Sequence, residues 1–200
     1  MPLTNVPAFP KHMFRVTVSL AGRDLGEWDA LSSGGSESDP KMYRGGGSRL
    51  KRVVPGLNSP KKIKLSRGYL DVTTPSKRDT GHVRAQIEAW LHKQARRVFH
   101  ERTLALLPRF APLTLPEPEL VIKPLKTHWG ACTHDGKITL NLALIRMPKT
   151  CIDYVIAHEL CHLVEHNHGK PFFALLGRVM PDWETRRRRL NDVLASVLEG

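Results

Sequence analysis

The order of hydrophobic and polar residues predicts a mixture of strands and helices along most of the chain. Alternating positions, or short apolar runs bounded by turn residues, indicate strands. The predicted strands are residues 14–20, two short runs within 62–75, residues 120–123 and residues 137–144. A cluster of prolines at 108–118 is expected to end a long helical segment and lead into the later strands.

Apolar residues that recur every three or four positions predict helices in the other segments. The first helix is expected to begin at Thr80 and to bury Val83, Ile87, Trp90, Leu91 and Val98. A second is expected to begin near Thr150, which forms a capping-box pattern with Asp153, and to end at 165–167. Third and fourth helices are expected on either side of Pro181. This order predicts an α+β fold, with a small antiparallel or mixed sheet packed with helices.

The second helix carries the sequence His-Glu-Leu-Cys-His at 158–162. His158 and His162 are four residues apart, so a helix places both imidazoles on one face, where they can hold one metal ion. Glu159 would lie beside that metal as a general base. This HExxH arrangement is typical of zinc hydrolases. A core-facing stripe is expected on the same helix, formed by Ile152, Val155, Ile156 and Leu163.

A catalytic zinc site needs a third protein ligand and keeps its fourth position open for water. Asn167 can close the helix in a left-handed conformation, and a turn there would fold His168 toward the metal. Glu165 and His166 are the competing ligands. Because tetrahedral geometry favours a ligand that approaches from off the helix, His168 is the preferred third ligand.

Two long segments around the HExxH motif match a known family. They are KTHWGACTHDGKITLNLALIRMP at 126–148 and CIDYVIAHELCHLVEHNHGKPFFALLGRVMPDW at 151–183, followed by a basic helix. Through them the chain resembles the YgjP-like metallopeptidase domain family, a relative of the SprT-like zinc metallopeptidases. The resemblance extends over 82–198 and only loosely over 47–81. It implies a zincin-like active-site helix, with His168 as third ligand followed by an aromatic pair, here Phe172 and Phe173.

The resemblance also places further segments beside the active-site cleft. It makes His128, Trp129 and Asn141 candidate substrate-binding residues, and His128 and Asn141 candidate donors to an oxyanion. Trp129 has a competing interpretation as a core aromatic, and Asn141 as a cap at a strand end. Two residues depart from the family pattern: His128 stands where arginine is usual, and Ala131 where serine is usual. Cys132 is a further candidate for a residue beside the site.

The expected reaction follows from zinc chemistry. One zinc ion held by His158, His162 and His168 would lower the pKa of its water from about 15.7 to near 7. Glu159 would take the proton as that water attacks a peptide carbonyl, and would return it to the leaving group. The strand at 137–144 is expected to offer an open edge that pairs with an extended peptide.

Residues 1–46 are expected to form a flexible N-terminal segment ahead of a metallopeptidase-like domain at 47–200. This segment contains a candidate first strand and runs into a Gly/Ser-rich linker at 32–49. The N-terminus lacks a signal-peptide core, and no apolar run approaches membrane-spanning length. Three cysteines make a disulfide framework improbable. These features predict a cytoplasmic protein without membrane contact.

The charge of the chain introduces two alternative functions. Lys and Arg number 31 against 19 Asp and Glu, a formal net charge of +12. Basic clusters at 61–67 and 186–189 are explained by a solvated surface. Alternatively, they contact nucleic acid in a protein whose metal site is only structural, although no nucleic-acid-binding signature accompanies them. The family resemblance also extends to nucleoside triphosphate pyrophosphatases, whose chemistry suits a metal with nearby arginines. A zinc-dependent peptidase acting on peptide or protein is the favoured prediction, because a structural site has no need of Glu159.

Overall fold

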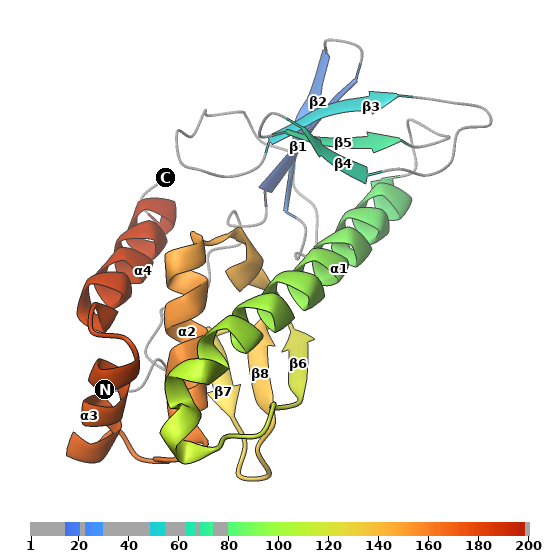
Figure 1. Ribbon diagram of the computed structural model, residues 1–200. Coiled ribbons are helices and arrows are strands. Elements are labelled where there is room, and N and C mark those ends of the chain that lie inside the picture. Colours follow the sequence, from blue (N-terminus) through green and yellow to red (C-terminus); the bar gives the residue numbers. More distant parts are fainter. Residues whose placement is uncertain are drawn as a thin grey trace. The chain divides into compact units, whose positions relative to one another are not determined.

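The computed structural model describes the chain in several stretches (Figure 1). They are the backbone of residues 15–20, 23–29, 49–54, 63–66, 69–73 and 80–198, with side chains described chiefly from 84 to 192. The chain divides into two compact units, one formed mainly by His92–Ser196 and the other mainly by Pro10–Leu91. The linker predicted at 32–49 lies outside the described residues apart from its last residue, and the boundary at 46 stays a prediction.

The Pro10–Leu91 unit contains two small sheets in its described part. In the first, β1 (Arg15–Leu20) pairs antiparallel with β2 (Arg23–Asp29). In the second, β5 (Tyr69–Thr73) lies between β3 (Arg49–Val54), which is parallel to it, and β4 (Ile63–Ser66), which is antiparallel. Strands β1, β4 and β5 confirm the alternation pattern. Charged residues and a glycine interrupt the apolar runs of β2 and β3, which were not predicted.

Helix α1 (Thr80–Leu106) begins at the predicted residue. Its buried row recurs every fourth residue, as one face of a helix requires, through Leu91, Ala95, Phe99 and Thr103. Phe99 is fully buried where Val98 was expected. The chain continues as the 3₁₀ helix η2 (Leu107–Leu113). Helical character therefore passes Pro108, because proline in the first turn of a helix removes an N–H that has no intrahelical partner.

Three strands form the sheet of the His92–Ser196 unit, in the order β6-β8-β7 (Figure 1). The central strand β8 (Ile138–Asn141) is parallel to β6 (Leu120–Lys123) and antiparallel to β7 (Gly130–Cys132). The strand predicted at 137–144 is thus shorter, and its last residues form the 3₁₀ helix η3 (Leu142–Arg146). Its expected open edge is wrong, because both edges of β8 are already paired.

Helix α2 (Lys149–His162) contacts β7 and β8 on one side and α3 on another (Figure 1). Every residue from 151 to 161 is buried, so the helix has no solvent-facing side over this length. The expected core-facing positions Ile152, Val155 and Ile156 are confirmed, and the burial extends around the rest of the helix. The capping box is also wrong, since no side chain caps α2. Asp153 instead accepts hydrogen bonds from Arg102 Nε and Nη2 at 2.6 and 2.9 Å, which ties α2 to α1.

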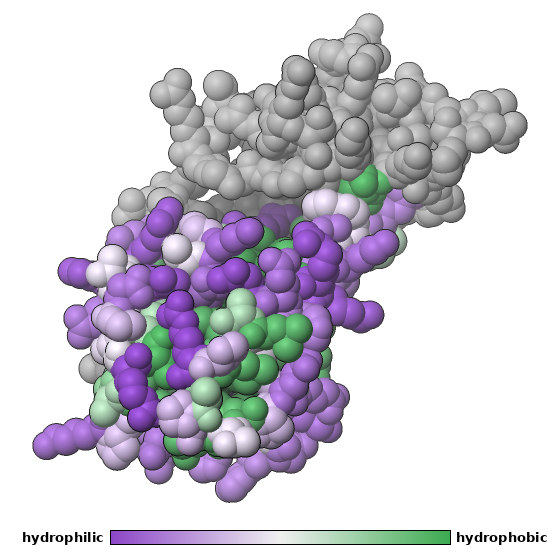
Figure 2. All heavy atoms as spheres, viewed as in Figure 1, coloured by the Kyte–Doolittle hydropathy of each residue, from purple (hydrophilic) through white to green (hydrophobic). Residues whose placement is uncertain are grey.

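Two further helices complete this unit. Pro171 lies in the first turn of α3 (Lys170–Val179), and α4 (Trp183–Leu198) follows Pro181 at the predicted place. Figure 2 shows one face of the molecule, on which hydrophobic residues gather among hydrophilic ones where α1 and α2 lie in Figure 1. No helix in the described part of the chain is long and apolar enough to cross a membrane. Helices packed with a small mixed sheet confirm the α+β prediction.

Candidate metal centre

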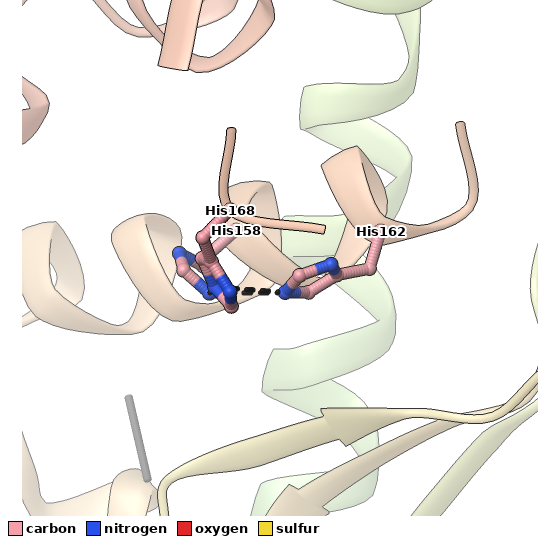
Figure 3. A group of neighbouring side chains, drawn as sticks. All are labelled: His158, His162 and His168. Atoms are coloured by element: carbon pink, nitrogen blue, oxygen red, sulfur yellow. Dashed lines mark hydrogen bonds between the residues drawn. The ribbon is translucent and has the colours of Figure 1, made fainter. Parts of the chain in front are cut away.

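Three imidazole rings converge at the end of α2 (Figure 3). His158 and His162 are one turn apart on the helix, and their Nε2 atoms are 3.3 Å apart. After His162 the chain turns back, so that His168 Nε2 lies 3.1 Å from His162 Nε2 and 2.9 Å from His158 Nε2. Among the described His, Cys, Asp and Glu side chains, these three form the group that could hold a metal ion.

The turn that returns His168 to the helix is held by backbone hydrogen bonds. The Val164 and Glu165 N–H groups donate to Cys161 O at 3.0 and 2.8 Å, and Gly169 N donates to Asn167 O at 2.7 Å. Helix α2 ends at His162, earlier than the predicted 165–167. The turn also brings the carbonyl of Glu165 within 3.1 Å of His162 Nδ1. When Nδ1 carries the proton and donates to this carbonyl, the Nε2 lone pair of His162 is left for a metal.

Burial keeps the three rings neutral. It is the largest cause that lowers the pKa of His158 to about 2, with His162, His168 and then Arg187 lowering it further. Burial, then His162, lowers the pKa of His168 to about 4, and burial lowers that of His162. Neutral imidazoles that point their Nε2 atoms at one another within about 3 Å present lone pairs to a common point. A cation resolves their mutual repulsion, so the donor set fits a metal such as zinc.

Phe172 packs against all three histidines. Its ring centroid lies 4.8 Å from that of His158 and 4.6 Å from those of His162 and His168, and its side chain is fully buried. Pro171 starts α3 just after His168 and so fixes where this ring enters the site. The apolar contact limits the orientations of the imidazoles and excludes water from one side of the centre. Such a wall raises the affinity of a metal site by pre-orienting its ligands.

Glu159, the residue after His158 on α2, is buried, with only 2% of its surface exposed. Burial raises the pKa of its carboxyl to about 8. The residue lies against the backbone of β7: a Cβ atom added at Gly130 would stand 2.7 Å from Glu159 Oε1 and 2.8 Å from its Cγ. No side chain tolerates such contacts, so this position of the strand requires glycine for the carboxyl group to occupy its place.

Cys132, two residues further along β7, is half-buried near the same carboxylate. Burial and then the charge of Glu159 raise the pKa of its thiol to about 11. The thiol is therefore protonated at neutral pH, whereas a cysteine that binds zinc does so as the thiolate. Cys132 does not join the described metal-binding group.

The two competing third ligands lie elsewhere. Glu165 faces His162 through its backbone carbonyl rather than its side chain. His166 is exposed, and its ring packs at 4.7 Å from that of His134, in the turn between β7 and β8. Neither belongs to the group that includes His168.

The three candidate substrate residues have different surroundings. Trp129 is 1% exposed and lies in the core. Asn141 is 1% exposed: its Nδ2 donates to Leu125 O and His128 O at 2.9 and 3.0 Å, and its Oδ1 accepts from Ala143 N as the cap of η3. Both side chains are thus buried within the protein and have no exposed surface that a ligand could contact. His128 is half-exposed, with Nδ1 2.9 Å from Thr127 Oγ1.

Two residues near the centre were not singled out from the sequence. Tyr154 lies one turn before His158 on α2, is 1% exposed, and has its ring centroid 6.0 Å from that of His158. Burial raises the pKa of its hydroxyl to about 12. Arg187 of α4 is the second, and its charge acts on Tyr154, His158 and His168. The four-residue spacing between Tyr154 and His158 could have indicated that the two share a helix face. Nothing in the sequence distinguishes Arg187 from the other three arginines at 186–189.

An α+β unit whose buried helix presents an HExxH motif to a third histidine has the construction of a metallopeptidase-type domain. The chain belongs to the YgjP-like family: the model of the YgjP-like metallopeptidase domain matches residues 36–193. This confirms the resemblance seen in the sequence and begins N-terminal to the region where it was recognised. No curated protein and no solved structure matched the chain.

The contact between Gly130 and Glu159 predicts a specific steric coupling. Gly130→Ala should lower the free energy of unfolding by about 1–3 kcal/mol, because the new methyl group has to displace a buried side chain. In a Glu159→Ala background the same substitution should cost much less, since the displaced atoms are gone. Urea unfolding of the four proteins measures this double-mutant cycle.

Gly177→Ala is the matched control, because a Cβ there would meet Trp183 Nε1 at an ordinary 3.8 Å. It should be neutral or slightly stabilising in a helix. An equal cost of Gly130→Ala with and without the Glu159 side chain would contradict the packing described.

The raised pKa of Glu159 predicts how pH acts on the metal-free protein. The unfolded carboxyl loses its proton near its ordinary pKa of 4.5, and the folded one near 8. Between these values the folded state binds more protons, so rising pH lowers the stability through this group. Chelator-treated Glu159→Gln should therefore gain stability over the chelator-treated wild type as pH rises from 5 to 8, reaching on the order of 2–4 kcal/mol. Urea unfolding at several pH values tests this, and a difference independent of pH would refute it.

Proposed function

We propose that the protein is a zinc-dependent peptidase in which Glu159 is the general base. The observation that carries this proposal is the convergence of three neutral imidazoles, whose Nε2 atoms lie within 3.3 Å of one another, at the end of a helix in which the residue after His158 is a buried glutamate. Three protein ligands leave a fourth position open, as a catalytic zinc site requires. Membership of a metallopeptidase domain family supports the same class of reaction.

The chain's own residues then have distinct tasks. When bound, the metal supplies a Lewis acid that polarises a carbonyl and lowers the pKa of water. A cation held by His158, His162 and His168 would also oppose the burial that raises the pKa of Glu159, and so favour its carboxylate near neutral pH. Glu159 would receive the proton of the attacking water and pass it to the leaving nitrogen. The buried side chains of Phe172 and of helix α2 would exclude bulk water from the site.

Among the described strands, β7 rather than β8 lies at an edge of the sheet that a peptide could use. Trp129 O accepts from Asn141 N, and Thr133 N donates to Lys137 O, so alternate residues of the strand face β8. The N–H and C=O groups of Gly130 and Cys132 therefore point to the outer edge. An extended peptide paired there would lie beside the strand against which Glu159 packs, which places its carbonyl groups near the base.

Two of the four arginines in the basic cluster at 186–189 on α4 have partners within the protein, and for this reason we favour a peptidase over a polyanion-binding surface. Arg186 pairs with Asp153 and Asp182 at 3.5 and 2.9 Å. Arg188 donates to Thr185 Oγ1 at 3.4 Å. Guanidinium groups held within the protein contribute less to a continuous phosphate-binding face. No contact in the described residues favours the nucleotide or nucleic-acid alternative specifically.

Turnover by zinc-loaded wild type and Glu159→Gln tests the proposal. Both proteins would be incubated with unstructured peptides and the common nucleoside triphosphates, and the products read by mass spectrometry. Peptide cleavage should fall by roughly 10²–10⁴-fold in Glu159→Gln while zinc affinity stays close to that of the wild type. Glu165→Gln, which removes the same charge six residues away, should cleave peptides like the wild type.

Two outcomes would overturn the proposal. Peptide cleavage that survives in Glu159→Gln would exclude this residue as the base. Loss of nucleoside triphosphates without peptide cleavage would assign the centre to phosphoryl chemistry instead.

A further inference from the structure

Arg187 occupies a particular face of α4. Trp183 lies one turn before it and Leu190 one turn after it, so the three share a side of the helix. Leu190 is 1% exposed, and the Trp183 ring stacks on Phe173 with centroids 5.4 Å apart. Phe173 in turn lies 6.3 Å from His168. The face of α4 that carries Arg187 is therefore the one packed toward the three histidines.

The charge of Arg187 lacks the partners that its neighbours have. Arg186 is bound by two aspartates, and Arg188 by a threonine. Arg187 is half-buried, yet within the described part of the chain it forms no hydrogen bond and no ion pair. A partly buried cation is costly without an anion, because it loses hydration that nothing replaces.

The groups on which Arg187 acts do not supply that anion. They are the Tyr154 hydroxyl, which burial keeps protonated, and the neutral rings of His158 and His168. Binding of a metal dication by these histidines would add positive charge next to the guanidinium. Among the described residues, none of the groups on which Arg187 acts is negatively charged, so the guanidinium is available to a negative group of a substrate.

Glu159 and Arg187 approach the centre from different elements. Glu159 packs on the backbone of β7, and burial is the one cause of its raised pKa, without a contribution from Arg187. Arg187 acts from α4 on the histidines and Tyr154. A substrate carbonyl between them would have the base near one side and a fixed positive charge near the other.

We propose that Arg187 binds the oxygen on which negative charge develops when the substrate carbonyl is attacked. The inference is carried by the half-buried guanidinium, which has no partner among the described residues and lies on the α4 face that packs toward His168; it rests on the proposed peptidase function. Arg187 would then be the donor to the oxyanion, a role for which the sequence suggested His128 and Asn141. Asn141 is occupied by its own hydrogen bonds, whereas Arg187 keeps its donors free within the described residues.

Anion binding tests the proposal independently of turnover. Inorganic phosphate is the probe, because its tetrahedral anionic oxygens resemble those of the attacked carbonyl. Titration calorimetry on the zinc-loaded protein should show phosphate binding that weakens at least about tenfold in Arg187→Met, with zinc affinity and thermal stability retained. Arg188→Met removes the same charge from the exposed neighbour and should bind phosphate like the wild type.

Peptide kinetics then identify the oxygen that is bound. A developing oxyanion predicts that Arg187→Met loses about 10²–10³-fold in kcat with little change in KM, and that Arg187→Lys retains part of the rate. A loss confined to KM, and only for peptides with a free C-terminal carboxylate, would show that Arg187 binds a ground-state carboxylate, which overturns the oxyanion assignment.

The remaining outcomes separate the two proposals. If the wild type cleaves no peptide but binds phosphate, and Arg187→Met does not bind it, the peptidase function is wrong while Arg187 remains the anion-binding residue. If Arg187→Met and Arg188→Met change phosphate binding equally, the inference about Arg187 is wrong. Should Arg187→Met not fold, Arg187→Lys replaces it, and unchanged phosphate affinity and kcat in that variant would contradict the contact of the Arg187 guanidinium with the oxyanion.

Discussion

The burial of α2 is the constraint on which the site depends. A helix that is enclosed from residue 151 to residue 161 places two imidazoles and a carboxyl group where water cannot compensate them. Burial lowers the pKa of the histidines and raises that of Glu159, so the same environment keeps the three imidazoles and the carboxyl group uncharged in the absence of a cation. A cation bound by the three histidines would compensate the cost of burying these polar groups.

The elements around α2 each contribute one part of the site. The strand β7 lacks a side chain at Gly130, which leaves the space that Glu159 occupies. The turn after His162 returns His168 to the helix, and α3 brings Phe172 against all three rings. Helix α4 brings Arg187 from another direction. Under the proposed function, these elements would hold a metal, a group that contacts the carbonyl oxygen and the proton acceptor Glu159 close together, as hydrolysis requires.

The sequence predicted those features that depend on local spacing. Two histidines four residues apart lie on one face of a helix wherever that helix lies. His168 was preferred as the third ligand because tetrahedral coordination favours a ligand that approaches from off the helix. Features that depend on tertiary packing were not predictable in this way. The strand β7 has only three residues, too few for a recognisable alternation. Its presence made β8 central, and the burial of α2 extends beyond the expected core-facing stripe to the whole circumference of the helix. Arg187 differs from Arg186 and Arg188 only through its partners in space.

Zinc titration of the metal-free protein would show whether the three histidines form the metal centre. We expect one tightly bound ion per chain in the wild type and in His166→Ala, because His166 packs on His134 rather than joining the centre. His168→Ala should lower the zinc affinity by roughly 10²-fold or more, because it removes one of the three ligands. Removing a residue that only hydrogen-bonds to a ligand already lowers metal affinity by about 10–100-fold. Equal affinity of His168→Ala and the wild type, or a loss in His166→Ala instead, would contradict the three-histidine centre.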